Sequence, residues 1–163
     1  MGYQAVNEIE KFTFEDCVVS NFLVSPAGIT LTLEALMVDS DNSQNTNYTQ
    51  SYADTTIARL LGGKIVKAVK DGYKYYDAND VLIKEIPDES LDESAINEII
   101  KKSEGAYLYY MEKVDTDEKM YVYNIGLEFV DESDNTIGDS YQITVSFEKA
   151  IFTWERYLNK VQR

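Results

Sequence analysis

Alternating apolar and polar positions predict β-strands along most of the chain. The cleanest run is residues 29–37, where every second side chain is apolar and shares one face: Ile29, Leu31, Leu33, Ala35 and Met37. A β-branched and aromatic run over 12–24 precedes it, and the turn Ser25-Pro26-Ala27-Gly28 joins the two. The pattern therefore predicts a hairpin over residues 12–38. The first strand is apolar on both sides, so the pattern does not show which of its faces is buried.

Short strands are expected between residues 55 and 86. The runs 55–61, 64–70, 73–76 and 81–86 are separated by turn signals at Gly62-Gly63, Asp71-Gly72 and residues 77–80. Asp-Gly between two such runs is the strongest short hairpin signal in the chain. We therefore expect a hairpin at Asp71-Gly72, and Pro87 ends the last run.

One amphipathic helix is predicted over about residues 91–103. Ser90-Leu91-Asp92-Glu93 has the spacing of a capping box, and Gly105 supplies a left-handed stop. The apolar positions fall on one helical face: Leu91, Ala95, Ile96, Ile99 and Ile100. Such a helix packs on one face of a sheet.

The last third of the chain alternates again. Residues 106–114, 121–129 and 141–151 predict strands, with Gly126 marking a bulge or bend. In the last of these runs one face holds Tyr141, Ile143, Val145, Phe147 and Ile151. Residues 131–139 form a polar connection, and residues 153–163 a strand end or a short helix.

These elements predict one α+β domain over residues 1–163, made mainly of antiparallel β-strands. The regular strand–helix alternation of a parallel sheet is absent. We expect a strongly bent sheet or a partly open barrel, with the helix packed on it. Residues 39–52 are rich in Asp, Asn, Ser, Gln and Thr and predict an exposed polar loop.

The chain has no histidine and one cysteine, which removes most catalytic and metal chemistry. Histidine is the commonest general base and metal ligand, and one thiol does not build a structural zinc site. The Asp-rich segments 39–43, 77–79 and 131–135 lack the glycine and glutamate of a calcium loop. We expect no cofactor, metal or catalytic residue, no enzyme activity, and Cys17 as a small buried hydrophobic side chain.

The net charge of −14 is distributed unevenly. Residues 1–58 contain one basic residue, Lys11, against eight acidic residues. Such a field repels nucleic acid and anionic membranes and attracts basic proteins. No signal peptide or membrane-length apolar run is visible, and a single cysteine suits a reducing compartment, so the expected location is the cytoplasm.

Thirteen tyrosines include pairs spaced at i and i+2, namely 73 with 75, 107 with 109 and 121 with 123. On a strand, both rings of such a pair lie on one face. They either stabilise the sheet by cross-strand pairing or form a protein-binding surface. Together with the acidic residues, the candidate partner-binding set is Glu15, Asp16, Glu34, Asp39, Asp41, Tyr107, Tyr109, Tyr121 and Tyr123.

Three segments share the style of a known class of small acidic proteins. They are Phe14-Glu15-Asp16-Cys17-Val18-Val19, Ile29-Thr30-Leu31-Thr32-Leu33-Glu34 and Gly105-Ala106-Tyr107-Leu108-Tyr109-Tyr110. The chain resembles the immunity proteins of bacterial polymorphic and contact-dependent toxin systems. The resemblance implies an inhibitor that neutralises a cognate toxin by tight binding. A nuclease-type toxin domain must be basic to hold phosphate, so an acidic inhibitor is steered toward it.

Two other functions remain open. The first is a small-ligand or carbohydrate-binding β-domain, or a carboxylate-dependent hydrolase, which needs a pocket with two carboxylates. Acidic residues in or beside predicted strands are Glu15, Asp16, Glu34, Glu112, Glu128 and Glu148. The second is a structural or assembly subunit, for example of phage origin, whose exposed edge strands pair with another chain.

Overall fold

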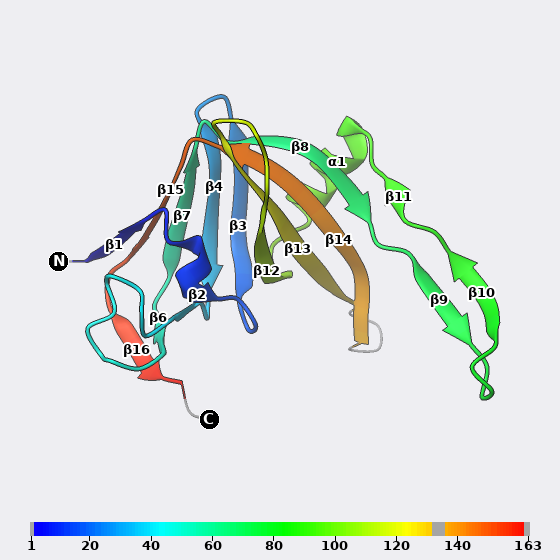
Figure 1. Ribbon diagram of the computed structural model, residues 1–163, viewed down its shortest axis with the longest axis horizontal. Coiled ribbons are helices and arrows are strands. Elements are labelled where there is room, and N and C mark those ends of the chain that lie inside the picture. The colour runs from blue at the N-terminus through cyan, green and yellow to red at the C-terminus, as the bar shows by residue number, and fades with distance from the viewer. Residues whose placement is uncertain (1, 132–135, 162–163) are drawn as a thin grey trace.

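A computed structural model describes residues 2–131 and 136–161 and confirms the α+β class (Figure 1). Its main element is an open, antiparallel, ten-stranded sheet with β1 and β11 at the edges. The strands, in order across the sheet, are β1 (Tyr3–Val6), β15 (Lys149–Trp154), β7 (Thr56–Leu61), β4 (Gly28–Glu34), β3 (Val18–Ser25), β12 (Tyr107–Val114), β13 (Tyr121–Asp131), β14 (Thr136–Phe147), β8 (Lys64–Lys70) and β11 (Glu89–Ser90).

The two halves of the sheet meet between β3 and β12, which share a single paired position, Val18 with Tyr107. The strands from β1 to β3 form the first half, and those from β12 to β11 form the second half. The chain passes between the halves at Gly62-Gly63 and again at Glu148, whose amide donates to the Leu61 carbonyl at 2.8 Å. The bent-sheet alternative is therefore confirmed, and within the described residues the sheet does not close into a barrel.

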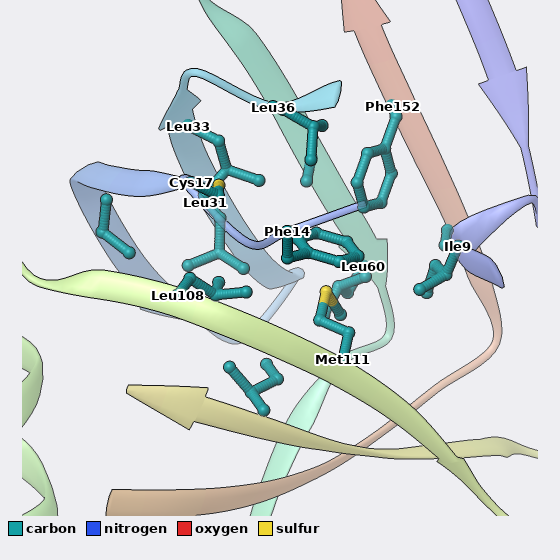
Figure 2. Close-up of a cluster of buried hydrophobic side chains, with 14 of the residues drawn as sticks. Ile9, Phe14, Cys17, Leu31, Leu33, Leu36, Leu60, Leu108, Met111 and Phe152 are labelled. Atoms are coloured by element: carbon teal, nitrogen blue, oxygen red, sulfur yellow. The ribbon is translucent and has the colours of Figure 1, made fainter. Parts of the chain in front are cut away.

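The hydrophobic core lies between the two halves (Figure 2). Leu31, Leu33 and Leu60 enter it from the first half, and Leu108 and Met111 enter it from the second. The core includes Cys17, which is fully buried, as predicted. Burial of this apolar surface, at about 25 cal/mol per Å², is the main force that holds the two halves together.

The helix α1 (Glu93–Lys101) packs its predicted apolar face against this core, with Ile99 buried. The helix begins two residues later than a cap at Ser90 would place it. Asp92 is the N-cap, and its carboxylate accepts from the Ala95 amide at 2.8 Å. Ser90 belongs to β11, where pairing with Val69 holds it in the sheet. Gly105 follows the helix with φ +86°, as expected for a left-handed stop.

A second, four-stranded sheet lies against the first half (Figure 1). Its strands are β16 (Tyr157–Lys160), β6 (Ser51–Ala53), β5 (Met37–Val38) and β2 (Phe12–Thr13), the last preceded by a short 3₁₀ helix, η1 (Ile9–Lys11). Aromatic stacking joins the two sheets, since the Phe12 ring lies 4.7 Å from the Phe152 ring. For residues 153–163 the sequence predicted either a strand end or a short helix. In the structure this tail contains strand β16, and residues 162–163 lie outside the described part.

The polar segment 39–52 is exposed in part, for example at Tyr48, and is held by hydrogen bonds from its own side chains. Asn42 is 3% exposed, and β6 already begins at Ser51. The side-chain amide of Asn45 donates from Nδ2 to three backbone carbonyls, those of Val38, Asp39 and Thr49, at 2.9 to 3.1 Å. Asn side chains readily replace backbone partners in this way, so the polar composition of this segment also supplies its internal hydrogen bonds.

The predicted hairpin at Asp71-Gly72 is wrong. β8 pairs with β14 and β11, whereas β9 (Tyr73–Tyr76) pairs with β10 (Leu82–Ile86) as a separate two-stranded sheet. The reversal occurs at residues 77–80, where Asp77 accepts from the Asn79 and Val81 amides. We call residues 73–86 the arm; Figure 1 shows it extending away from the rest of the molecule.

Gly72 has another role than turning the chain. A Cβ at this position would lie 2.0 Å from the Ile86 carbonyl oxygen, so only glycine lets the two strands of the ribbon approach at the base of the arm. The Gly72 amide donates to the Asp88 carboxylate at 2.7 Å. The chain therefore continues from β8 into β9 through Gly72 and does not reverse direction there.

Two predicted strands are interrupted. The strand from Ile29 ends at Glu34, because Ala35 adopts φ +57°, and Leu36 then enters the core in its place. The run 141–151 breaks at Glu148, which shifts the alternation by one, so Ala150, not Ile151, faces the core. The polar connection 131–139 is shorter than expected, since β14 begins at Thr136; residues 132–135 lie outside the described residues.

Candidate functional site

The sheet of the second half has an outer face, which points away from the core. Directly paired residues of antiparallel strands share a face, so the pairing defines rows of neighbouring side chains. The first row crosses five strands and consists of Glu34, Val18, Tyr107, Glu128 and Ser140. The intervening residues Leu108 and Leu127 are buried in the core. An acidic residue of β4 thus shares a row with a tyrosine of β12.

The second row of this face is Tyr110, Gly126, Gln142 and Val69. The Tyr110 ring lies over Gly126, where a Cβ would come within 2.2 Å of the ring. Across this gap the Tyr110 hydroxyl donates to Gln142 Oε1 at 2.9 Å. The absence of a side chain at position 126 therefore lets one tyrosine span β13.

A β-bulge adds a further ring. The pairing of β12 with β13 shifts between Leu108 and Tyr110, which leaves Tyr109 as the extra residue. The Tyr109 and Tyr110 rings meet edge to face, with centroids 4.7 Å apart. The bulge thus brings Tyr109 beside Tyr110 and Tyr107 on the second half of the sheet. Tyr107 is 39% exposed.

Carboxylates surround these rings. Burial raises the pKa of Tyr109, and the charges of Asp71 and Glu128 raise it further. Burial also raises the pKa of Tyr110, with Tyr109, Asp71 and Glu112 adding to the effect. Both tyrosines are therefore neutral hydrogen-bonding groups at neutral pH.

The Asp71 carboxyl has a raised pKa as well, first because of burial and then because of Asp88. Within residues 2–131 and 136–161, no ion pair joins Asp71, Glu112 or Glu128 to a lysine or arginine. We name this group the tyrosine–carboxylate surface: Glu34, Asp71, Tyr107, Tyr109, Tyr110, Glu112, Glu128 and Gln142.

The structure brings three of the predicted site residues into this surface, Glu34, Tyr107 and Tyr109. Glu34 also accepts from the Thr55 hydroxyl at 2.8 Å. Glu15 and Asp16 are exposed just before β3, and the Tyr52 hydroxyl donates to Asp16 at 3.0 Å. These two acids extend the negative charge beyond the start of β3.

The remaining predicted residues lie elsewhere. Asp39 accepts from Thr13 at 2.7 Å and from Gln50 at 3.0 Å, so it stabilises the small sheet, and Asp41 is exposed in the folded loop. Tyr121 and Tyr123 stack on Phe147, at 5.8 and 5.5 Å, on the core face. Tyr123 is 6% exposed, so its ring is not available to a partner, and cross-strand pairing describes this pair correctly.

Sequence reasoning missed Tyr110, Asp71 and Gln142, and it named Glu112 and Glu128 only as carboxylates for the alternative hydrolase. The i, i+2 rule selected Tyr107 and Tyr109, but the bulge at Tyr109 places the adjacent Tyr110 beside it. Asp71 was assigned to a hairpin turn that does not form. Glycine at position 126 was the available signal, since an isolated glycine within a strand marks close approach of another group.

One groove combines an apolar lining with carboxylates, as a hydrolase or sugar-binding domain would need. It lies between α1 and strands β8, β13 and β14, has a volume of about 480 Å³, and is lined by apolar residues including Leu91, Ala95, Ile99, Phe129 and Tyr141. Its carboxylates are Glu89, Glu98 and Asp139.

Two of these three carboxylates are held in ion pairs. Glu98 pairs with Lys102 at 3.5 Å, and Asp139 pairs with Lys70 at 3.6 Å. Among the residues that the structure describes, no group of three or more Cys, Asp or Glu side chains is arranged to hold a metal ion. The described helices also include none that is long and apolar enough to cross a membrane.

Comparison of the chain with protein-family models, with curated proteins and with solved structures finds no match.

Proposed function

We propose that this protein is an acidic inhibitor that binds a basic protein through the tyrosine–carboxylate surface. The observation that supports it is the grouping of Tyr107, Tyr109 and Tyr110 with the carboxylates of Glu112 and Glu128 on one sheet face. Tyrosine gives a large contact area with few rotatable bonds and is enriched at interfaces.

The chemistry of this surface suits lysine and arginine. A guanidinium stacks on a tyrosine face and pairs with a carboxylate in the same contact. The edge-to-face contact of Tyr109 with Tyr110, and the hydrogen bond from Tyr110 to Gln142, hold the rings before a partner arrives. Such pre-organisation lowers the entropy cost of binding.

The most specific form of this proposal is an immunity protein that neutralises a cognate toxin by tight binding. The resemblance of the sequence to that class favours it, and so does the net charge of −14. The partner would be a basic protein, for example a nuclease-type toxin domain, because a surface that holds phosphate is positively charged.

Co-expression with the product of the gene immediately upstream tests this form. If that product is toxic alone, and this protein restores growth and co-purifies with it in a stoichiometric complex, the proposal is supported. A harmless neighbour, or a toxic one that does not bind, contradicts the immunity form. The groove beside α1 would then be the first place to search for a small ligand.

Charge reversal maps the binding surface. The pair Glu112→Lys and Glu128→Lys should weaken the complex at least tenfold, because two attractive contacts become repulsive. A matched pair, Asp115→Lys and Asp117→Lys, changes the net charge equally in an exposed loop outside this surface. Equal weakening by both pairs would show that the total charge, and not this surface, attracts the partner.

A further inference from the structure

One ring of the tyrosine–carboxylate surface lies flat on the sheet. A Cβ at Gly126 would come within 2.8 Å of three adjacent atoms of the Tyr110 ring, Cε2, Cδ2 and Cζ. An approach to the ring edge would bring only one or two atoms that close, so this position meets the face of the ring. The ring cannot turn freely, because its hydroxyl donates to Gln142 at 2.9 Å. Tyr110 therefore covers β13 as a fixed aromatic plate.

Tyr109 forms a corner with this plate. Its ring makes an angle of 88° with the Tyr110 ring, and the two centroids are 4.7 Å apart. In an edge-to-face pair the edge of one ring is directed at the face of the other, so the two rings do not cover each other as a parallel stack would. Both side chains are partly exposed. A flat group can therefore contact aromatic surface at this corner.

Three carboxylates border the corner. Glu112 lies two residues beyond Tyr110, on the same face of β12. Glu128 lies on the same face of the neighbouring strand, β13. Asp71 continues the row of Glu128, because its amide donates to the carbonyl of Ser140, which is paired with Glu128. The aromatic corner thus has carboxylates on both sides along the sheet.

These three carboxylates have no cation close to them. Within the described residues they form no ion pair and accept no hydrogen bond. Lys67 lies on the same face, but its row runs from Glu112 through Asn124 and Thr144, which places it three strands away, at about 14 Å. Like charges that lie together repel one another, so a bound cation would stabilise this group.

We propose that this corner binds the guanidinium of an arginine side chain in preference to the ammonium of a lysine. The inference rests on the proposed function and names the residue that the basic partner presents. A guanidinium is planar and weakly hydrated, so it can stack on a tyrosine ring while its N–H groups donate to carboxylates in the same plane. An ammonium is compact and strongly hydrated, so it gains less from the rings. A neutral planar group would leave the carboxylates without a counter-charge.

Two peptides of equal charge test the preference, tetraarginine amide and tetralysine amide. Titration into the ¹⁵N-labelled protein gives both dissociation constants and shows which amide signals shift. The wild-type chain should bind the arginine peptide about fivefold more tightly. The largest shifts should fall on Tyr109, Tyr110 and Glu112. Tyr109→Leu should weaken the arginine peptide to the level of the lysine peptide, because it removes a ring and no charge.

Matched variants separate the rings from the charge. Tyr48→Leu, at a ring that is 93% exposed elsewhere, should leave the preference unchanged. Glu112→Gln with Glu128→Gln should weaken both peptides. Asp115→Asn with Asp117→Asn removes the same charge from an exposed loop and should weaken them less. Circular dichroism shows whether each variant is folded.

Three results would overturn the inference: equal affinity of the wild-type chain for the two peptides, no binding of the arginine peptide at millimolar concentration, or a preference that survives Tyr109→Leu. The co-expression experiment is independent of these results. An upstream product that co-purifies although the peptides bind equally would support the proposed function and refute the arginine site. An arginine preference without a binding neighbour would do the reverse for the immunity form.

Discussion

At the scale of single residues, the candidate surface depends on a missing side chain. Gly126 is buried under the Tyr110 ring, and this close approach lets the hydroxyl reach Gln142 on the next strand but one. The geometry of the tyrosine pair is therefore set by a position that has no side chain to contribute to binding.

Gly126→Ala should destabilise the fold and displace this ring. The added methyl would lie 2.2 Å from the ring, so Tyr110 must move and lose its bond to Gln142. We expect a loss of about 1–3 kcal/mol in the free energy of unfolding, measured by urea denaturation. In a Tyr110→Ala background the same substitution should cost much less. An equal cost in both backgrounds would show that the ring is not the obstacle.

Cys17 should be unreactive in the native protein. It is fully buried, and both burial and the charge of Glu34 raise the pKa of its thiol, so the reactive thiolate is scarce. Labelling with a thiol reagent such as dithionitrobenzoate should be slow in buffer and complete in denaturant. Rapid labelling of the folded protein would contradict the burial of this side chain.

At the scale of elements, the residue that caps α1 is not the one that the sequence motif indicates. Ser90 matches the capping-box spacing, but the carboxylate of Asp92 caps the helix. The difference arises because pairing of Ser90 with Val69 keeps that residue in a strand. Strand pairing thus fixes where the helix begins.

Asp92→Ala should therefore cost about 1 kcal/mol of stability, the usual value for a lost N-cap. Ser90→Ala is the matched control and should change the free energy of unfolding by less than about 0.5 kcal/mol. Chemical denaturation of both variants measures the difference. The opposite ranking would restore Ser90 as the cap.

Hydrophobic period and turn chemistry predicted most strands and the helix, because these signals are local. They did not predict pairing that depends on distant parts of the chain. Asp71-Gly72 has the composition of a hairpin turn, yet β8 is held by β14 and β11, which lie far along the chain. The break at Glu148 was not predicted either. It shifts the alternation by one residue, so Ile151 does not face the core.

The candidate site was predicted less completely, since its rows join four or more strands. Glu34 and Tyr107 were identified as single residues, but the register that aligns them through Val18 is a property of three strands. The bulge at Tyr109 depends on how β12 meets β13, so the neighbouring Tyr110 gave no separate signal in the spacing of tyrosines.

At the scale of the whole molecule, the net charge of −14 sets how fast a basic partner arrives. Screening shortens the range of this field to about 10 Å at 0.1 M salt and about 3 Å at 1 M. If the proposed function holds, the association rate with the basic partner should fall at least tenfold between 50 and 500 mM salt, with a smaller change in dissociation rate. Stopped-flow mixing measures both. An association rate that ignores salt would contradict electrostatic steering.

Stability should decline at alkaline pH. Burial raises the pKa of Tyr123 to about 12, with Glu10 and Tyr121 adding to the effect, against about 10 in the unfolded chain. The unfolded state therefore loses its proton first, and this contribution to stability is lost as pH rises from about 10 through about 12. Urea midpoints between pH 9 and 12 measure the decline.

Tyr123→Phe should make this alkaline dependence shallower, because the titrating hydroxyl is removed while the buried ring remains. Tyr48→Phe, at a side chain that is 93% exposed, should leave the dependence unchanged. A wild-type midpoint that stays constant across this range would show that the Tyr123 hydroxyl is not held neutral by the fold.

The order of strands at one sheet edge has a consequence for synthesis on the ribosome. β1, made of residues 3–6, pairs with β15, made of residues 149–154, and β15 also separates β1 from β7. β1 therefore has no strand partner until residues 149–154 have been made, whereas residues 18–61 already contain the paired strands β3, β4 and β7, and residues 64–147 contain the described strands of the second half. We expect the second half to gain structure while the chain is still being made. β15 then adds to the free edge of β7, and β1 adds to β15, in a late step after residues 149–154 have left the exit tunnel.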